Sequence, residues 1–226
     1  MKYFVLGAFS SALFLYGIAF IYGITGTTNL MGIAQAFSQV EFLELQAVHN
    51  VTGEQVLKLA TLPAIAMVLV LVAFGFKIGA VPFHMWTPDA YQGAPSVSTG
   101  FMATAVKAAA FGGMIRVFVT GFWPQAARNS DTGWLVALAV LAVITVIVGN
   151  LVAIVQKDVK RMLAYSSIAH AGYLLVGFTA ASYSGANFIT MDAVLFYLIA
   201  YTFATLGAFA VLAHFGKRGE ECTTYD

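Results

Sequence analysis

Two lysines lie within apolar stretches that otherwise have the composition of membrane helices. Lys107 lies near the centre of a stretch from about Ser96 to Val119, and Lys77 lies in the preceding stretch, Ala66 to about Trp86. A lysine at the centre of a bilayer helix costs about 2.5–3.5 kcal/mol on insertion scales, and such residues mark ion or proton pathways. Burial disfavours the charged form of an amine, so a buried lysine gains or loses a proton when a nearby charge moves. The pair therefore indicates proton carriage.

The alternative is that each lysine extends to an interface or pairs with a carboxylate from elsewhere. Measured from the turn between the stretches, roughly Thr87 to Pro95, both amines lie about 15–17 Å from the same membrane face at 1.5 Å per residue. Extension to an interface is poor for Lys107, which is central in its stretch, and no acidic residue lies inside either stretch. The sequence thus predicts two amines that face each other at similar depth, on adjacent antiparallel helices.

Two prolines and a histidine follow Lys77. Pro82 removes one backbone donor and frees the carbonyl of Ile78, and Pro88 follows it. A helix interrupted here would open a polar pocket next to Lys77, and a simple kink is the alternative. His84 lies on the same face as Lys77 if the helix stays regular. It would then relay a proton toward the cytoplasm, or else act as a hydrogen-bonded interfacial histidine.

Polar residues also cross two later stretches. His170 lies mid-stretch and shares a helical face with Ser166, four residues earlier. A relay role and interhelical hydrogen bonding are both open for His170. A similar stripe on the last stretch is interpreted as interhelical hydrogen bonding, and its members are Tyr197, Tyr201 and Thr205. Lys2, at the edge of the first stretch, is by itself typical of an interfacial anchor.

The elements that must position these residues are membrane helices. The chain has 226 residues, of which 60% are hydrophobic and 9% charged, against about 25% charged in a soluble domain. Strands are not indicated, because strict alternation is lacking. The sequence predicts an all-α polytopic membrane helix bundle of about six transmembrane helices. They are Tyr3–Ile24, Ala66–Trp86, Ser96–Val119, Trp134–Val155, Met162–Ala181 and Ala193–Phe215.

Basic residues in the short connections orient this bundle. The connection 156–161 holds three basic residues and is therefore placed in the cytoplasm. Counting spans from it puts Met1 and the tail, residues 216–226, on the cytoplasmic side, and the connection 25–65 outside. Residues 1–226 then form a single transmembrane domain. A net charge of +1 indicates no nucleic-acid partner, and the sequence has no metal-binding spacing and no phosphate-binding loop.

Three blocks of sequence resemble one membrane protein family. The run from Phe76 to Pro95, FKIGAVPFHMWTPDAYQGAP, resembles a signature of the antiporter-like membrane subunits of NADH:quinone oxidoreductase, respiratory complex I. The run AVKAAAF, which contains Lys107, is similar to the family's next lysine-bearing helix, and KRMLAYSSIAHAGY matches a third block. The combination looks most like the subunit N (subunit 2) members. The resemblance covers nearly the whole chain.

The resemblance implies a larger fold and roles for named residues. Family members have about fourteen helices in two inverted repeats, of which this chain would cover roughly the sixth to the eleventh. Lys77 matches the lysine of the interrupted helix, and Lys107 matches the connecting lysine. Lys2 matches a further intramembrane lysine, and His170 matches a polar position on a central water axis. The family's glutamate partner for the first lysine and its second-repeat lysine lie on helices that this chain does not include.

The resemblance also implies a function. The chain would be a proton-translocating membrane-arm subunit of an enzyme complex, with no redox chemistry of its own. It would bind no cofactor, and NAD, FMN, iron–sulfur clusters and quinone would belong to partner subunits. Its partners would be the other membrane subunits of complex I and the lipid bilayer, in a bacterial inner membrane. The alternatives are a cation/proton antiporter or membrane-bound hydrogenase subunit of the same superfamily, and a non-transporting structural subunit.

Overall fold

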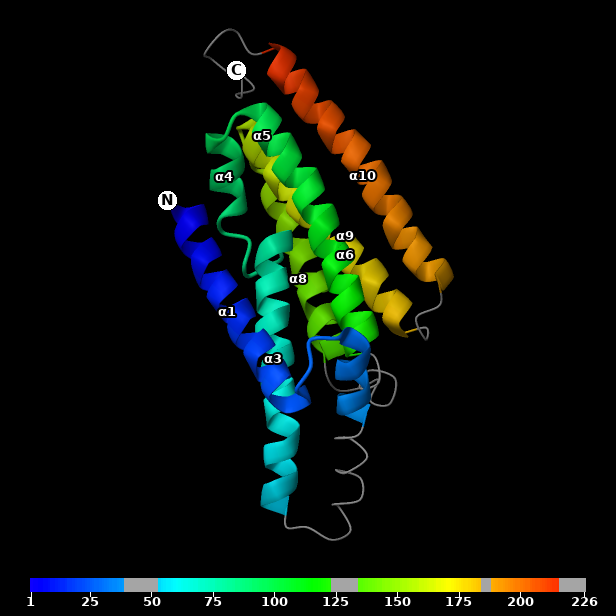
Figure 1. Ribbon diagram of the computed structural model, residues 1–226. Helices are drawn as coiled ribbons and strands as arrows, with labels where there is room; N and C mark the ends of the chain where they lie inside the picture. Colours follow the sequence, from blue (N-terminus) through cyan, green and yellow to red (C-terminus); the bar gives the residue numbers. More distant parts are fainter. Residues whose placement is uncertain (39–52, 123–133, 184–187, 216–226) are drawn as a thin grey trace.

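The computed structural model describes residues 1–38, 53–122, 134–183 and 188–215, and every regular element in these ranges is a helix (Figure 1). The predicted all-α fold is thus confirmed. The elements are α1 (Lys2–Thr25), α3 (Gly53–Ile78), α4 (Thr87–Gly93), α5 (Ser96–Phe101), η1 (Met102–Val106), α6 (Lys107–Ile115), η2 (Arg116–Gly121), α8 (Trp134–Ile154), α9 (Val159–Tyr183) and α10 (Phe188–Phe215).

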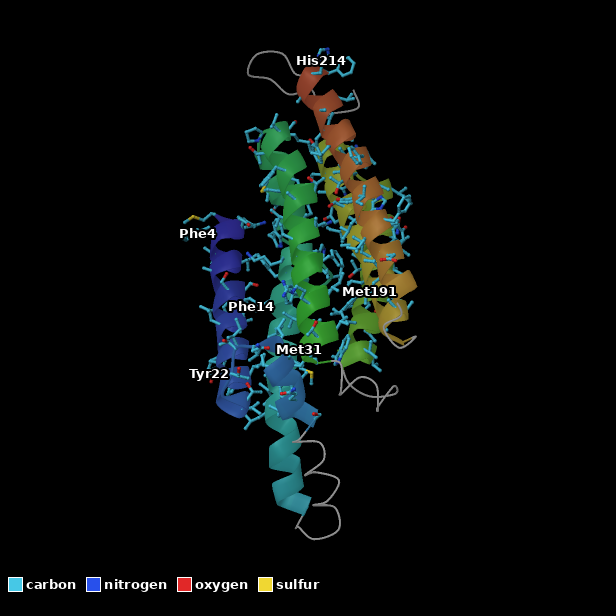
Figure 2. All side chains as sticks on the ribbon, turned by 45° about the vertical axis from the view of Figure 1, so that its right-hand side comes forward. Phe4, Phe14, Tyr22, Met31, Met191 and His214 are labelled. Carbon is cyan, nitrogen blue, oxygen red and sulfur yellow. The ribbon has the colours of Figure 1, made fainter. Side chains whose placement is uncertain are left out.

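The long helices pack side by side as a bundle. α8 packs along α9, α1 packs along α3, and α10 contacts both α9 and α5. Aromatic and aliphatic side chains fill the interior, and its largest fully buried members include Phe111, Phe118, Leu138, Leu174 and Phe178. Large apolar side chains also cover the outside. Figure 2 shows Phe4 and Tyr22 of α1 pointing away from the bundle. Apolar residues on both surfaces of a helix are typical of a protein surrounded by lipid.

Four helices are long and apolar enough to cross a membrane. They are Lys2–Thr25, Ser96–Gly121, Trp134–Ile154 and Met191–Phe215, and each coincides with one predicted span. The predicted span Met162–Ala181 lies within α9, which is 25 residues long. Lys160 and Arg161 lie in the first turn of this helix. The predicted second span corresponds to a shorter apolar helix, Leu62–Ile78.

The predicted second span, Ala66–Trp86, is wrong at its C-terminal end. α3 ends at Ile78, and the next helix, α4, begins at Thr87. Gly79 has a φ of 73°, which L side chains rarely adopt, and a Cβ at this position would lie 2.9 Å from the Thr87 hydroxyl oxygen. The interruption is therefore built on a glycine that no larger residue replaces without strain.

The two prolines have different places in this interruption. Pro82 follows the end of α3 by four residues, whereas Pro88 lies in the first turn of α4, where a missing N–H breaks no helical hydrogen bond. Because the helix ends before Pro82, His84 does not continue the face of α3 that carries Lys77. The expectation of a shared face fails for this reason.

Other groups satisfy the backbone and side chains freed by the interruption. The N–H of Val81 donates a buried hydrogen bond of 3.0 Å to the Thr145 hydroxyl on α8, and the indole N–H of Trp86 donates one of 3.0 Å to the carbonyl of Phe76. Ala80 N–H donates to the carbonyl of Gly75 at 2.8 Å. Irregular backbone at membrane depth is tolerated only when protein or water satisfies it. Thr145 therefore anchors the interrupted segment to α8.

Thr145→Val should destabilise the protein, because it leaves the buried N–H of Val81 without an acceptor. The expected loss is about 1–3 kcal/mol, measured as a lower thermal unfolding temperature of the assembled complex. Thr179→Val is the matched control, since the Thr179 hydroxyl donates only to the carbonyl of Leu175 in its own helix. Equal unfolding temperatures for the two variants would show that Thr145 does not anchor the segment.

The predicted connection 25–65 contains more helix than the sequence indicated. Residues 30–38 are helical and α3 begins at Gly53, so much of the described part of this connection is regular structure. The Asn29 side-chain oxygen accepts a hydrogen bond from the N–H of Met31 at 2.9 Å and thereby caps the first of these helices. The predicted tail, 216–226, lies outside the described residues.

Candidate functional site

Lys107 is buried at the centre of the bundle. The residue is 2% exposed. Its ammonium donates hydrogen bonds to both the carbonyl and the hydroxyl oxygen of Ser167 on α9. The ammonium also lies 5.5 Å from the centre of the Tyr201 ring on α10, which is within cation–π range. The helix just before Lys107, η1, has π geometry, a local widening that is frequent at functional sites.

Hydroxyl and imidazole groups extend from Lys107 along α9 and α10. The oxygens of Ser167 and Tyr201 lie 2.7 Å apart, and Nδ1 of His170 is hydrogen bonded to the Tyr197 hydroxyl. The rings of His170 and Tyr201 are 5.1 Å apart at their centres. A cavity of about 320 Å³ lies against these residues and Thr205. Each of these side chains can donate and accept hydrogen bonds, and the hydrogen bonds join them in two pairs, Ser167 with Tyr201 and His170 with Tyr197.

Three members of this group were not assigned a proton-transfer role from the sequence. Ser167 carries no signal apart from its place beside Ser166, and Tyr197 and Tyr201 were interpreted as interhelical hydrogen bonds. The four-residue spacing of the two tyrosines was the available signal, since it places them on one face of α10. Only the packing of α10 on α9 brings that face to His170.

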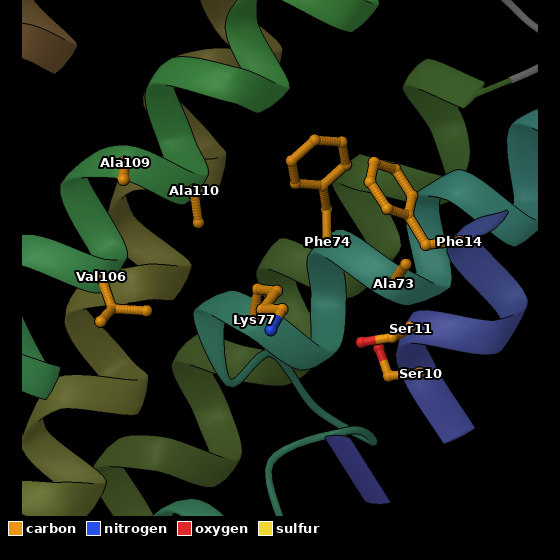
Figure 3. A pocket seen from close by; sticks show the side chains of 9 residues that line it. All are labelled: Ser10, Ser11, Phe14, Ala73, Phe74, Lys77, Val106, Ala109 and Ala110. Atoms are coloured by element: carbon orange, nitrogen blue, oxygen red, sulfur yellow. The ribbon is translucent and has the colours of Figure 1, made fainter. Parts of the chain in front are cut away.

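Lys77 lies in a second cavity, of about 380 Å³, between α1, α3 and the helix of Lys107 (Figure 3). It is in the last turn of α3, where the unpaired carbonyls of a helix end favour a positive charge. Unlike Lys107, Lys77 is exposed in the described part of the chain, and its ammonium has no hydrogen-bond partner there. The cavity is less polar than the sequence predicted. Lys77 and two serines of α1, Ser10 and Ser11, supply its polar side chains.

The two lysines do not face each other, contrary to the sequence-based expectation. Val106, Ala109 and Ala110 line the Lys77 cavity, whereas Lys107 contacts α9 and α10. Successive residues of a helix are rotated by about 100°, so Lys107 points to a different side from these neighbours. The backbone of one helix, from η1 into α6, therefore separates the Lys77 cavity from the Lys107 cluster.

Lys2 and His84 lie apart from the Lys107 cluster. The ammonium of Lys2 is 2.6 Å from one carboxylate oxygen of Asp89 on α4, and Arg161 of α9 lies 2.9 Å from the other. The N-terminus, α4 and the start of α9 thus lie at the same end of the bundle (Figure 1). This arrangement agrees with the prediction that Met1 and the connection 156–161 are on the same side of the membrane. His84 is half-buried, its ring centre lies 6.4 Å from that of Tyr165, and its Nδ1 has no partner among the described residues.

Asp89→Asn should have a small, pH-dependent effect. Hydrogen bonds from Lys2 and Arg161 hold the pKa of the Asp89 carboxyl below its usual range. The carboxylate therefore stabilises the fold above the ordinary aspartate pKa of about 3.9, and this contribution disappears as the pH falls through the lowered value. Asp89 is partly exposed, so we expect less than about 1 kcal/mol. Thermal unfolding should separate wild type from Asp89→Asn at pH 7 and bring them together in strong acid. A constant difference at every pH would contradict this origin.

An interrupted helix, apolar spans and a buried lysine hydrogen bonded to a serine of a neighbouring helix define a polytopic membrane protein. Residues 1–225 match the family described as "NADH:quinone oxidoreductase/Mrp antiporter, TM", and the chain belongs to this family. Among the described residues, no group of three metal-ligating side chains gathers as a metal site.

Individual relatives agree with this assignment. The chain is 49% identical to NADH-quinone oxidoreductase subunit N 1 of Sorangium cellulosum over 100% of its length and 42% of that protein. It is 47% identical to the subunit N of Trichlorobacter lovleyi, covering 97% of this chain and 40% of the relative. The chain thus spans less than half the length of these relatives. It is an integral membrane protein, and its bacterial relatives assign it to a bacterial inner membrane.

Solved structures show the same fold. A chain of respiratory complex I from Thermus thermophilus with bound aureothin matches 94% of this chain and 39% of its own length, with a TM-score of 0.68 and 42% identity. A chain of the Mrp complex from a Dietzia species matches 93% of this chain and 34% of its own length, with a TM-score of 0.72 and 24% identity. The second likeness concerns the fold alone.

Proposed function

We infer that this chain carries protons across the membrane as part of a NADH:quinone oxidoreductase. The observation that carries the proposal is the burial of Lys107 with its ammonium bonded to Ser167 and stacked over Tyr201. Burying an ionisable group within a membrane protein costs free energy, so such a residue is by default a functional-site hypothesis. Lys107 also lies next to a group of side chains that can exchange protons. The identity of 49% to a subunit N, against 24% to the Mrp complex, favours the oxidoreductase over an antiporter.

The proposed route has two sections. Lys77 changes protonation in its own cavity, and Lys107 takes up the proton on the other side of the helix that separates them. Ser167 and Tyr201 then extend the route toward His170, whose ring centre lies 5.1 Å from that of Tyr201 and whose Nδ1 is bonded to Tyr197. His84, within the interrupted segment, and Lys2, at the charged end of the bundle, are assigned to the cytoplasmic entrance. Pro82 lies within the helix break that follows Lys77, and Pro88 lies in the first turn of the helix after it.

The same proposal covers the surroundings of the chain. Residues 1–226 form one transmembrane domain without a bound cofactor. NAD, FMN, iron–sulfur clusters and quinone belong to partner subunits, where the redox steps occur. Quinone reduction there supplies the charge movement to which Lys77 responds. The immediate partners are other membrane subunits of the complex and the lipid bilayer.

Proton pumping by the assembled complex tests this function. The full-length subunit with Lys107→Met should support assembly but little proton uptake into inside-out vesicles during quinone reduction. Lys157→Met is the control, because Lys157 is exposed in the connection between α8 and α9. Pumping by Lys107→Met at the rate of the control would contradict the proposal and favour a structural role for the chain.

A further inference from the structure

The Lys77 cavity contains an unusual hydroxyl group. Ser10 is 3% exposed, and its oxygen has no hydrogen-bond partner among the described residues, not even a carbonyl of its own helix. A serine inside a helix can donate to the carbonyl one turn earlier. A buried polar atom left unpaired costs free energy, so each instance requires an explanation. Ser10 lines the same cavity as Lys77.

Lys77, which is exposed in the described part of the chain, also lacks a hydrogen-bond partner. Its ammonium carries three donors, yet it has no hydrogen-bond partner in the described part of the chain, whereas the ammonium of Lys107 has Ser167 and Tyr201. Figure 3 shows the hydroxyl groups of Ser10 and Ser11 on the side of α1 that faces Lys77. The remaining cavity residues are apolar, so these two serines are the described side chains available to solvate the amine there.

The cavity suits water at this position. Its volume of about 380 Å³ is ample for water molecules, each of which needs about 30 Å³ and two to four polar partners. Lys77, Ser10 and Ser11 supply three such partners. Water held by Ser10 accepts a hydrogen bond from the ammonium and donates one to the neutral amine, so it serves both protonation states.

We propose that Ser10 is a positioning residue for Lys77, and that its hydroxyl holds the water through which Lys77 exchanges its proton. This inference deepens the proposed function and rests on it. It adds the middle of α1 to the proton route, in which this helix otherwise takes part only through Lys2 at its first residue. Ser10 acts through the water and the lysine, and it does not itself carry the proton.

The experiment compares two substitutions of Ser10, one that removes the hydroxyl group and one that keeps it. Ser10→Ala removes the hydroxyl and shrinks the side chain, whereas Ser10→Thr keeps the hydroxyl and adds a methyl group that the adjoining cavity has room for. Both are made in the full-length subunit of the assembled complex, and proton pumping per quinone reduced is measured in reconstituted vesicles. Ser98→Ala, at an exposed serine of α5, is the control.

Ser10→Ala should lower proton translocation by about fivefold, the effect of losing one hydrogen bond to a neutral partner such as water, whereas Ser10→Thr should pump at the wild-type rate. The reverse order, in which threonine impairs and alanine does not, would assign Ser10 to packing and overturn the inference. Equal losses in both variants would overturn it in the same way. If both variants pump normally while Lys107→Met does not, the Ser10 inference fails and the proposed function stands. If Lys107→Met also pumps normally, the proposed function itself fails.

Discussion

Lys107→Arg should abolish proton translocation as completely as Lys107→Met, although it keeps the positive charge. A guanidinium has a pKa above about 12, so releasing its proton near pH 7 costs about 7 kcal/mol more than a poised amine requires. If Lys107 exchanges protons with Ser167 and Tyr201, a permanent cation in its place blocks the route. If the position requires only a positive charge for structure, arginine preserves function.

The measurement is the ratio of protons moved to quinone reduced in reconstituted vesicles, after the abundance of assembled complex has been equalised. Lys157→Arg is the control for the chemical change, since Lys157 lies exposed in a connection. Ser167→Ala, which removes the hydroxyl but keeps the carbonyl that Lys107 also contacts, should give an intermediate loss. Wild-type pumping by Lys107→Arg would exclude proton exchange at this lysine.

Gly149→Ala should prevent α8 and α9 from packing, although it adds only one methyl group. A Cβ at Gly149 would lie 2.7 Å from the backbone nitrogen of Ala169 and 2.9 Å from its Cα. Backbone atoms do not move aside as a side chain would, so the helices must separate. On α9, a Cβ at Gly172 would likewise lie 2.9 Å from the backbone nitrogen of Val146 on α8. Close backbone approach through small residues is how membrane helices gain packing energy, and we expect a loss of more than about 4 kcal/mol.

The readout is the amount of the subunit in assembled complex, resolved by native gel electrophoresis. Gly112→Ala provides the matched control, because a Cβ at Gly112 of α6 would meet nothing within 4 Å. Normal assembly of Gly149→Ala would show that the α8–α9 contact is looser than described. Any Gly149→Ala complex that does assemble should pump poorly, since displacing α9 moves Ser167 and His170 away from Lys107.

These expectations connect the packing to the chemistry. α9 supplies the carbonyl and hydroxyl that hold Lys107, and its position depends on two glycine contacts with α8. α8 in turn holds the interrupted segment after Lys77 through Thr145. One helix pair therefore fixes both lysine sites. A change in the packing between α8 and α9 should therefore alter the surroundings of both lysines.

The sequence by itself determined the helical class and most of the membrane spans, and it located Lys77 and Lys107 within apolar runs. These follow from local properties, because about 20 apolar residues cross a bilayer as a helix and a charge within such a run is visible at once. The irregular backbone after Lys77 was also indicated locally, by Pro82. Its boundary at Ile78 was not, because the left-handed turn at Gly79 depends on the space beside Thr87.

The tertiary structure alone decided which way each side chain faces and what it contacts. In a soluble helix the apolar stripe reveals the buried face, but here the lipid-facing and core-facing surfaces are both apolar, so the pattern gives no rotation about the helix axis. The separation of Lys77 from Lys107, the pairing of Lys107 with Ser167 and Tyr201, and the contact between Thr145 and Val81 all depend on that rotation. Each joins residues far apart in the chain, so only the packing of the helices specifies them.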